Sequence, residues 1–102
     1  MKMNFDVEKI EFEVSNDFKD SGKKYVVETF LDCAKKYVPS IKERTTYKLK
    51  LGKVEVKFNK PISLNAIINV LRSIPSNSCL TIEEIEYERE AKKVEVEIET
   101  QK

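Results

Sequence analysis

The chain has 102 residues with a net charge of +1; 36% of the residues are charged and 40% are hydrophobic. This length and hydrophobic content predict one domain, residues 1–102, that buries its own core without a stapling metal or disulfide. The balanced charge gives no global attraction to nucleic acid or membrane, and no signal segment or long apolar run occurs, so we expect an intracellular, cytoplasmic protein.

Three short stretches share one pattern: KIEFEV from Lys9, KVEVKF from Lys53 and KVEVEI from Lys93. Apolar and charged residues alternate strictly in each, which is typical of a strand with one buried and one solvated face. Because solvated faces are common in antiparallel sheets and rare in purely parallel ones, the three stretches predict strands of a mostly antiparallel sheet.

Two stretches with helical spacing lie within residues 23–40 and 61–76. Asp20 or Ser21 is placed to cap the first helix and Pro39 to end it, and Ser63 and Pro75 have these roles in the second. The predicted apolar faces comprise Val26, Val27, Phe30, Leu31, Ala34 and Tyr37 in the first helix, and Leu64, Ile67, Ile68, Leu71 and Ile74 in the second.

Each predicted helix is followed by a further alternating stretch, TTYKLKL over residues 45–51 and EEIEYERE over residues 83–90. Both are interpreted as strands, with Tyr47 and Tyr87 on their apolar sides. For the second stretch, a helix from Thr81 to Ala91 that opens with a capping box is the alternative. Gly52 predicts a tight hairpin between its flanking strands, because glycine accepts the positive φ of such turns.

The predicted order is therefore β-α-β-β-α-β-β, in which a β-α-β unit is used twice, over about residues 8–51 and 52–99. This order resembles the ferredoxin-like fold, which implies an α+β protein with both helices on one face of the sheet. We expect the extra C-terminal strand to extend the sheet beyond the fourth, in the spatial order 5-4-1-3-2. An alternative is two β-α-β-β lobes with a groove between them.

The usual catalytic groups are missing from the sequence. Histidine is absent, so a serine or cysteine lacks its most common base, and DSGKK lacks the first glycine and the Ser or Thr of a phosphate-binding loop. We expect no enzyme activity, no cofactor and no metal site. Cys33 and Cys79 are expected to be packing residues, with a disulfide between them as the alternative.

Charge is distributed unevenly along the chain. Residues 42–60 hold seven basic side chains against Glu43 and Glu55, whereas residues 83–99 hold eight glutamates against Arg89, Lys92 and Lys93. Opposite charges at two ends of one sheet are compatible with an ordinary solvated surface. The alternative is a pair of docking surfaces, either for a second copy in a homodimer or for an oppositely charged partner.

Two functions are compatible with these features. The first is a non-enzymatic protein- or peptide-binding module that uses an exposed edge strand or the groove between the repeats. Its expected contact residues are Thr45, Thr46, Tyr47, Lys48, Lys50 and Tyr87. The alternative is nucleic-acid binding through the basic stretch 42–60, although the predicted open sheet face lacks the aromatic residues on which RNA-recognition modules stack bases.

The chain also resembles the small orphan proteins of filamentous viruses that infect hyperthermophilic archaea. The resemblance rests on length, Lys and Glu bias, missing catalytic residues and the degenerate duplication. It implies a protein without enzymatic motifs, in a host cytoplasm, and it favours the binding module.

Overall fold

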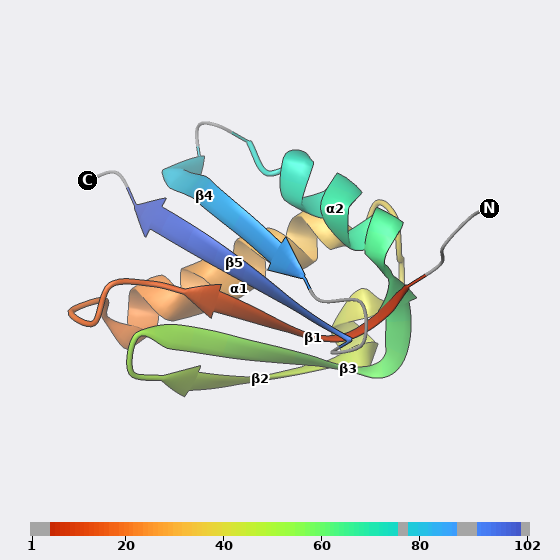
Figure 1. The fold of residues 1–102 in the computed structure, drawn as a ribbon, viewed down its shortest axis with the longest axis horizontal. Helices are drawn as coiled ribbons and strands as arrows, with labels where there is room; N and C mark the ends of the chain where they lie inside the picture. The colour runs from red at the N-terminus through yellow and green to blue at the C-terminus, as the bar shows by residue number, and fades with distance from the viewer. Residues whose placement is uncertain (1–4, 76–77, 88–91, 101–102) are drawn as a thin grey trace.

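The computed structural model of this chain describes residues 5–75, 78–87 and 92–100. Its elements are β1 (Asp6–Glu13), α1 (Asp20–Ala34), the 3-10 turn η1 (Ile41–Arg44), β2 (Thr45–Lys50), β3 (Lys53–Ser63), α2 (Leu64–Arg72), β4 (Leu80–Tyr87) and β5 (Lys93–Thr100). One sheet holds all five strands, and both helices cover the same face of it (Figure 1). The β1–β5 pair is parallel and the other pairs are antiparallel, so the predicted α+β class and mostly antiparallel sheet are confirmed.

The three similar stretches of sequence form the three central strands, β3, β1 and β5. Lys9 to Glu13 pairs in parallel register with Lys93 to Glu97, so that Ile10 lies beside Val94. Their alternating apolar residues all point toward the helices and are almost inaccessible. The buried set on these strands is Val7, Ile10, Phe12, Val54, Val56, Phe58, Ile62, Val94, Val96 and Ile98. The period of two therefore places one face of each strand in the core.

The predicted spatial order of the strands is wrong for two of them, because β4 and β5 exchange places. The observed order is β2-β3-β1-β5-β4, with β5 inserted between β1 and β4. Val94 and Val96 of β5 are fully buried, whereas Tyr87 of β4 is 51% exposed. A strand with two neighbours has its apolar face covered more completely than an edge strand. The valine-rich strand therefore takes the inner place, and the glutamate-rich strand is left at the edge.

The structure does not confirm a duplicated unit. β2 lies beside β3, but β5 separates β4 from β1, so the two halves do not form equivalent arrangements. One sheet and one hydrophobic core replace the alternative of two lobes, and no groove between lobes is formed by the described residues. The recurring sequence pattern reflects three strands that share one environment.

The two helices differ in how well the sequence predicted their ends. Ser63 accepts a hydrogen bond from the Ala66 N–H at 3.2 Å and caps α2 as expected. At α1 the N-cap is Lys19, which makes no side-chain cap bond, so the predicted capping by Asp20 or Ser21 is wrong. α1 ends at Ala34, well before Pro39, and Tyr37 lies beyond the helix, 45% exposed.

The remaining local predictions also have clear outcomes. Gly52 turns the β2–β3 hairpin with φ of +73°, as predicted. Residues 80–87 form a strand, so the helix alternative from Thr81 is wrong; residues 88–91, where it would have ended, lie outside the described residues. Both cysteines are free: Cys33 packs against the core as expected, whereas Cys79 is exposed with φ of 64°.

Candidate binding edge and charged sheet face

β2 is one of the two outer strands of the sheet. In the described part of the chain it pairs with β3 alone, so its other side presents unpaired backbone groups. This outer side of β2 is called the β2 edge below; Figure 1 shows it at the margin of the sheet, next to the hairpin. Natural edge strands are often short and carry lysines, and β2 has six residues that include Lys48 and Lys50.

Five of the predicted contact residues lie together on β2. Tyr47 points toward the helix side, where it is 44% exposed beside the half-buried Leu49. Thr46, Lys48 and Lys50 point to the opposite face, called the open face below. Thr45 donates its hydroxyl hydrogen to the Ile41 carbonyl at 2.6 Å and so anchors the strand to η1.

Tyr87 does not join this group. One row of paired residues crosses the sheet from Tyr47 through Val56, Ile10 and Val94 to Tyr87. With strands about 4.8 Å apart, four steps separate the two tyrosines by about 19 Å. They lie at opposite edges, so the described residues do not bring Tyr47 and Tyr87 together in a groove between the repeats.

Two carboxylates in the middle of the open face are almost completely buried. Glu11 on β1 and Glu55 on β3 lie opposite each other and are 7% and 5% exposed. Lysines of β1, β2, β3 and β5 surround them. The ion pairs are Lys9–Glu11 at 3.5 Å, Lys53–Glu11 at 3.8 Å, Lys93–Glu11 at 3.7 Å, Lys9–Glu55 at 3.7 Å, Lys50–Glu55 at 2.8 Å and Lys57–Glu55 at 3.4 Å. Charged side chains therefore cover the centre of this face, and it carries no aromatic ring among the described residues.

The surrounding lysines strongly change the pKa of Glu55. The hydrogen bond from Lys50 is the main cause that lowers its pKa to about 2, with Lys57 and Lys9 adding to it against the opposing effect of burial. The carboxylate is therefore ionised at neutral pH, where it holds the surrounding lysines and is a poor general acid or base.

The other half of the open face, on β4 and β5, is acidic. At the adjoining end of β1, where Glu13 pairs with Glu97 of β5, burial followed by neighbouring glutamates raises the pKa of Glu13. The hydrogen-bonded neighbour Glu99 raises the pKa of Glu83, and Glu84 does the same to the pKa of Glu86. Among the described residues no group of three or more metal-ligating side chains is arranged to hold an ion. This half therefore carries mutually repelling negative charge.

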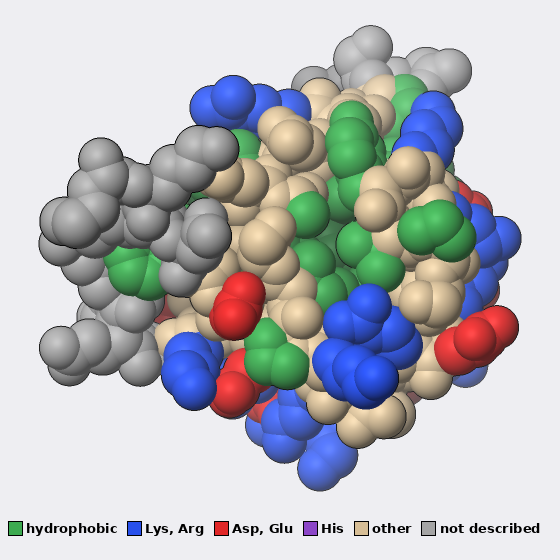
Figure 2. Space-filling model, turned by 90° about the vertical axis from the view of Figure 1, so that its right-hand side faces the viewer, with side chains coloured by type: hydrophobic (Ala, Val, Ile, Leu, Met, Phe, Trp, Pro, Cys, Tyr) green, Lys and Arg blue, Asp and Glu red, His purple; other side chains and the backbone are tan. Residues whose placement is uncertain are grey.

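The basic stretch 42–60 does not form one continuous positive surface. Lys42 pairs with Asp32 at 3.0 Å, and Arg44 donates to the carbonyls of Lys60 and Pro61 at 3.0 and 3.4 Å. Figure 2, which faces the end of the molecule where β3 passes into α2, shows separate basic side chains around an apolar hollow, with acidic ones between them. The positive charge is thus dispersed on this side, and that of Lys42 is paired with Asp32.

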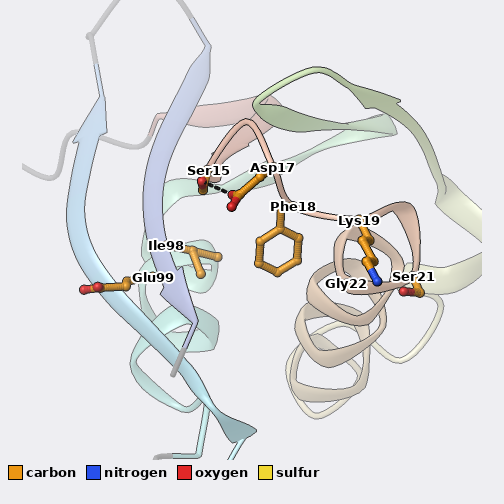
Figure 3. A pocket seen from close by; sticks show the side chains of 8 residues that line it. All are labelled: Ser15, Asp17, Phe18, Lys19, Ser21, Gly22, Ile98 and Glu99. Atoms are coloured by element: carbon orange, nitrogen blue, oxygen red, sulfur yellow. Dashed lines mark hydrogen bonds between the residues drawn. The ribbon is translucent and has the colours of Figure 1, made fainter. Parts of the chain in front are cut away.

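A hollow of about 670 Å³ opens where α1 begins and β5 ends. Phe18 and Ile98 point toward each other across it, while Glu99 points away (Figure 3). Gly22 makes room for the ring, because a Cβ there would lie 2.1 Å from Phe18 Cε1. The residues that line the hollow are Ser15, Asp17, Phe18, Lys19, Ser21, Gly22, Ile98 and Glu99. The hollow offers apolar contact, but its charged groups do not converge on one point.

Comparison with protein-family models, curated proteins and solved structures found no match for this chain. The fold and the two charged halves define its class: an α+β sheet protein with one helix-covered face, one charged face and two unequal edges. No helix among the described residues is long and apolar enough to cross a membrane.

Sequence reasoning missed the β4 edge. The expected order put the C-terminal strand outermost, so Glu84, Ile85 and Glu86 were not recognised as edge residues. One signal was present in the sequence: LTIEEIEY breaks its alternation at the paired glutamates, where the structure has a register shift between Ile82 and Glu84. Bulges are common in edge strands.

Proposed function

We propose that this protein is a non-enzymatic binding module that takes an extended segment of another polypeptide onto the β2 edge. The observation that carries the proposal is the position of β2 as an outer strand with half-exposed Tyr47 and exposed Lys48 beside unpaired backbone. An added strand gains main-chain hydrogen bonds from such an edge, while alternate side chains provide selectivity.

The chemistry of the edge defines the segment that fits. On the open face the added strand meets Lys48 and, to a smaller extent because it already pairs with Glu55, Lys50, so acidic residues are favoured there. On the helix side it meets Tyr47 and Leu49, so apolar residues are favoured at the alternate positions. The preferred ligand is an extended segment that alternates glutamate or aspartate with branched or aromatic residues.

An NMR titration tests this proposal. A short synthetic peptide that alternates glutamate with isoleucine should shift the backbone amide signals of β2, and a peptide with lysine in place of glutamate should not. Lys48→Glu should weaken the shift, whereas Lys36→Glu, at an exposed residue beyond α1, should leave it unchanged. Absence of any β2 response to the acidic peptide at low salt contradicts the proposal.

Nucleic-acid binding through residues 42–60 is the alternative, and the ion pairs of Lys42, Lys50, Lys53 and Lys57 argue against it. A shift assay with short DNA and RNA at low salt separates the two functions, because phosphate contacts strengthen as salt falls. Affinity that follows the backbone charge and is unaffected by acidic peptide favours the alternative.

A further inference from the structure

The two outer strands of the sheet carry opposite charges on the open face. β2 presents Lys48 and Lys50 there, and β4 presents Glu84 and Glu86. Pairing β2 with β2 of a second copy sets lysine against lysine, and pairing β4 with β4 sets glutamate against glutamate. Like charges opposite each other destabilise a sheet and unlike charges stabilise it. Charge therefore disfavours β2–β2 and β4–β4 pairing between copies and favours pairing of β2 with β4.

Strand direction is compatible with β2–β4 contact between copies. β2 and β1 are both antiparallel to β3 and so run the same way, whereas β4 is antiparallel to β5, which is parallel to β1. β2 and β4 therefore run in opposite directions within one molecule. A second copy shifted sideways along the sheet presents its β4 antiparallel to β2, with its helices on the same face.

Continuing the register of the sheet into the next copy defines one set of residues that would meet. Rows of paired residues that begin on β2 end on β4 as Tyr47 to Tyr87, Lys48 to Glu86, Leu49 to Ile85 and Lys50 to Glu84. Continuing each row into the next copy places Lys48 beside Glu86 and Leu49 beside Ile85. All four contacts are of compatible chemistry, on both faces, in this one register.

The same contact covers exposed apolar surface. Tyr47 and Tyr87 are among the few large hydrophobic side chains that are strongly exposed, at 44% and 51%. Aromatic pairs across strands are favourable, and the row places these two rings side by side.

We propose that copies of this chain associate head to tail through antiparallel pairing of β2 with β4 of the next copy. The inference rests on the proposed function and names the partner of the β2 edge as a second copy. Such a contact joins two different surfaces, so it produces open oligomers instead of a closed dimer. Each strand adds a twist of about −20° to −25°, so the joined sheet winds into a helical ribbon. One strand pair is a small interface, which makes the association weak and dependent on concentration.

Sedimentation of the full chain over a concentration series tests the proposal. At low salt the average mass should rise past that of a dimer, and salt should reverse it. Lys48→Glu and Glu86→Lys should each weaken association roughly fivefold or more, because each sets like charges opposite one another. The double variant with both changes should recover association, since it exchanges the two charges across the same contact.

Matched controls and contrary outcomes are available. Lys36→Glu and Glu28→Lys change charge at exposed sites away from both edges and should have no effect. Lys48→Gln, a milder change, covers the case in which Lys48→Glu does not fold, and should weaken association less. A dimer strengthened by Lys48→Glu overturns the proposal in favour of β2–β2 pairing. A monomer at every concentration overturns it as well, and the acidic-peptide titration then decides separately whether the β2 edge binds at all.

Discussion

Replacing Glu55 with glutamine should destabilise the protein in a way that depends on pH. Glu55 is 5% exposed and holds Lys50, Lys57 and Lys9 at 2.8, 3.4 and 3.7 Å. Its pKa falls from 4.5 to about 2 on folding, chiefly because of the Lys50 hydrogen bond. Glutamine keeps the shape of the side chain but removes the charge that these lysines share.

The size of the effect follows from the pKa. A shift of this extent corresponds to about 3 kcal/mol in the free energy of unfolding, at about 1.4 kcal/mol per pKa unit. Lys50 and Lys57 are 43% and 54% exposed, so water screens the pairs. Screening reduces the expected loss to about 2 kcal/mol, or about 8–16 °C in Tm for a domain of this size.

The pKa shift also defines how the stabilising contribution of Glu55 changes with pH. Because the folded pKa of Glu55 lies below the unfolded one, its stabilisation is complete above 4.5 and is lost as the pH falls toward about 2. Urea unfolding of both proteins, followed by circular dichroism, should show a difference at neutral pH that shrinks through this range. Glu43→Gln, at an exposed residue of η1, should change stability by less than about 0.5 kcal/mol. An equal deficit for Glu55→Gln at neutral and acid pH refutes the electrostatic reasoning.

Three further changes have defined outcomes in the same unfolding assay. Gly52→Ala should cost about 1 kcal/mol or more, because φ is +73° and the new Cβ would lie 2.5 Å from the Asn16 Oδ1 atom; no loss would contradict the turn geometry. Phe12→Ala should cost about 3–5 kcal/mol, since its ring is fully buried, edge-on to Phe30 at 5.5 Å; a mild effect would mean that the core refills. Glu13→Gln should stabilise the protein at neutral pH, because the raised folded pKa penalises the charged form, and this gain should vanish as the pH falls below 4.5; a gain that persists in acid contradicts the assignment.

The inner faces of the strands could be predicted well from the sequence. Alternation at Ile10, Val54 and Val94 identified residues that the structure buries completely, and Ser63 and Gly52 fixed a helix start and a turn. These features depend on residues close together in the chain, so the backbone geometry and the period of the side chains are sufficient to predict them. The extent of α1 was predicted less well. Tyr37 fits the helical spacing, yet the helix ends at Ala34 before the chain passes into η1.

The candidate site was predicted only in part. Thr46, Tyr47, Lys48 and Lys50 lie on an outer strand as expected, but Tyr87 belongs to the opposite edge. Both β4 and β5 contain alternating residues, and the only local difference is the break in the alternation of β4 at its paired glutamates. That break does not by itself select the partner of β1, whereas the structure places Val96 of β5 beside Phe12.

The sequence alone determined the elements of this protein, the buried side of each strand and the separation of basic from acidic segments, because these depend on residue type and short-range period. Only the tertiary structure decided that β5 lies inside and β4 outside. The physical reason is that the inner strand buries its apolar face more completely than the edge strand, and the apolar face of β5 is the one that is almost fully buried. The result is a sheet with lysines at one edge and glutamates at the other.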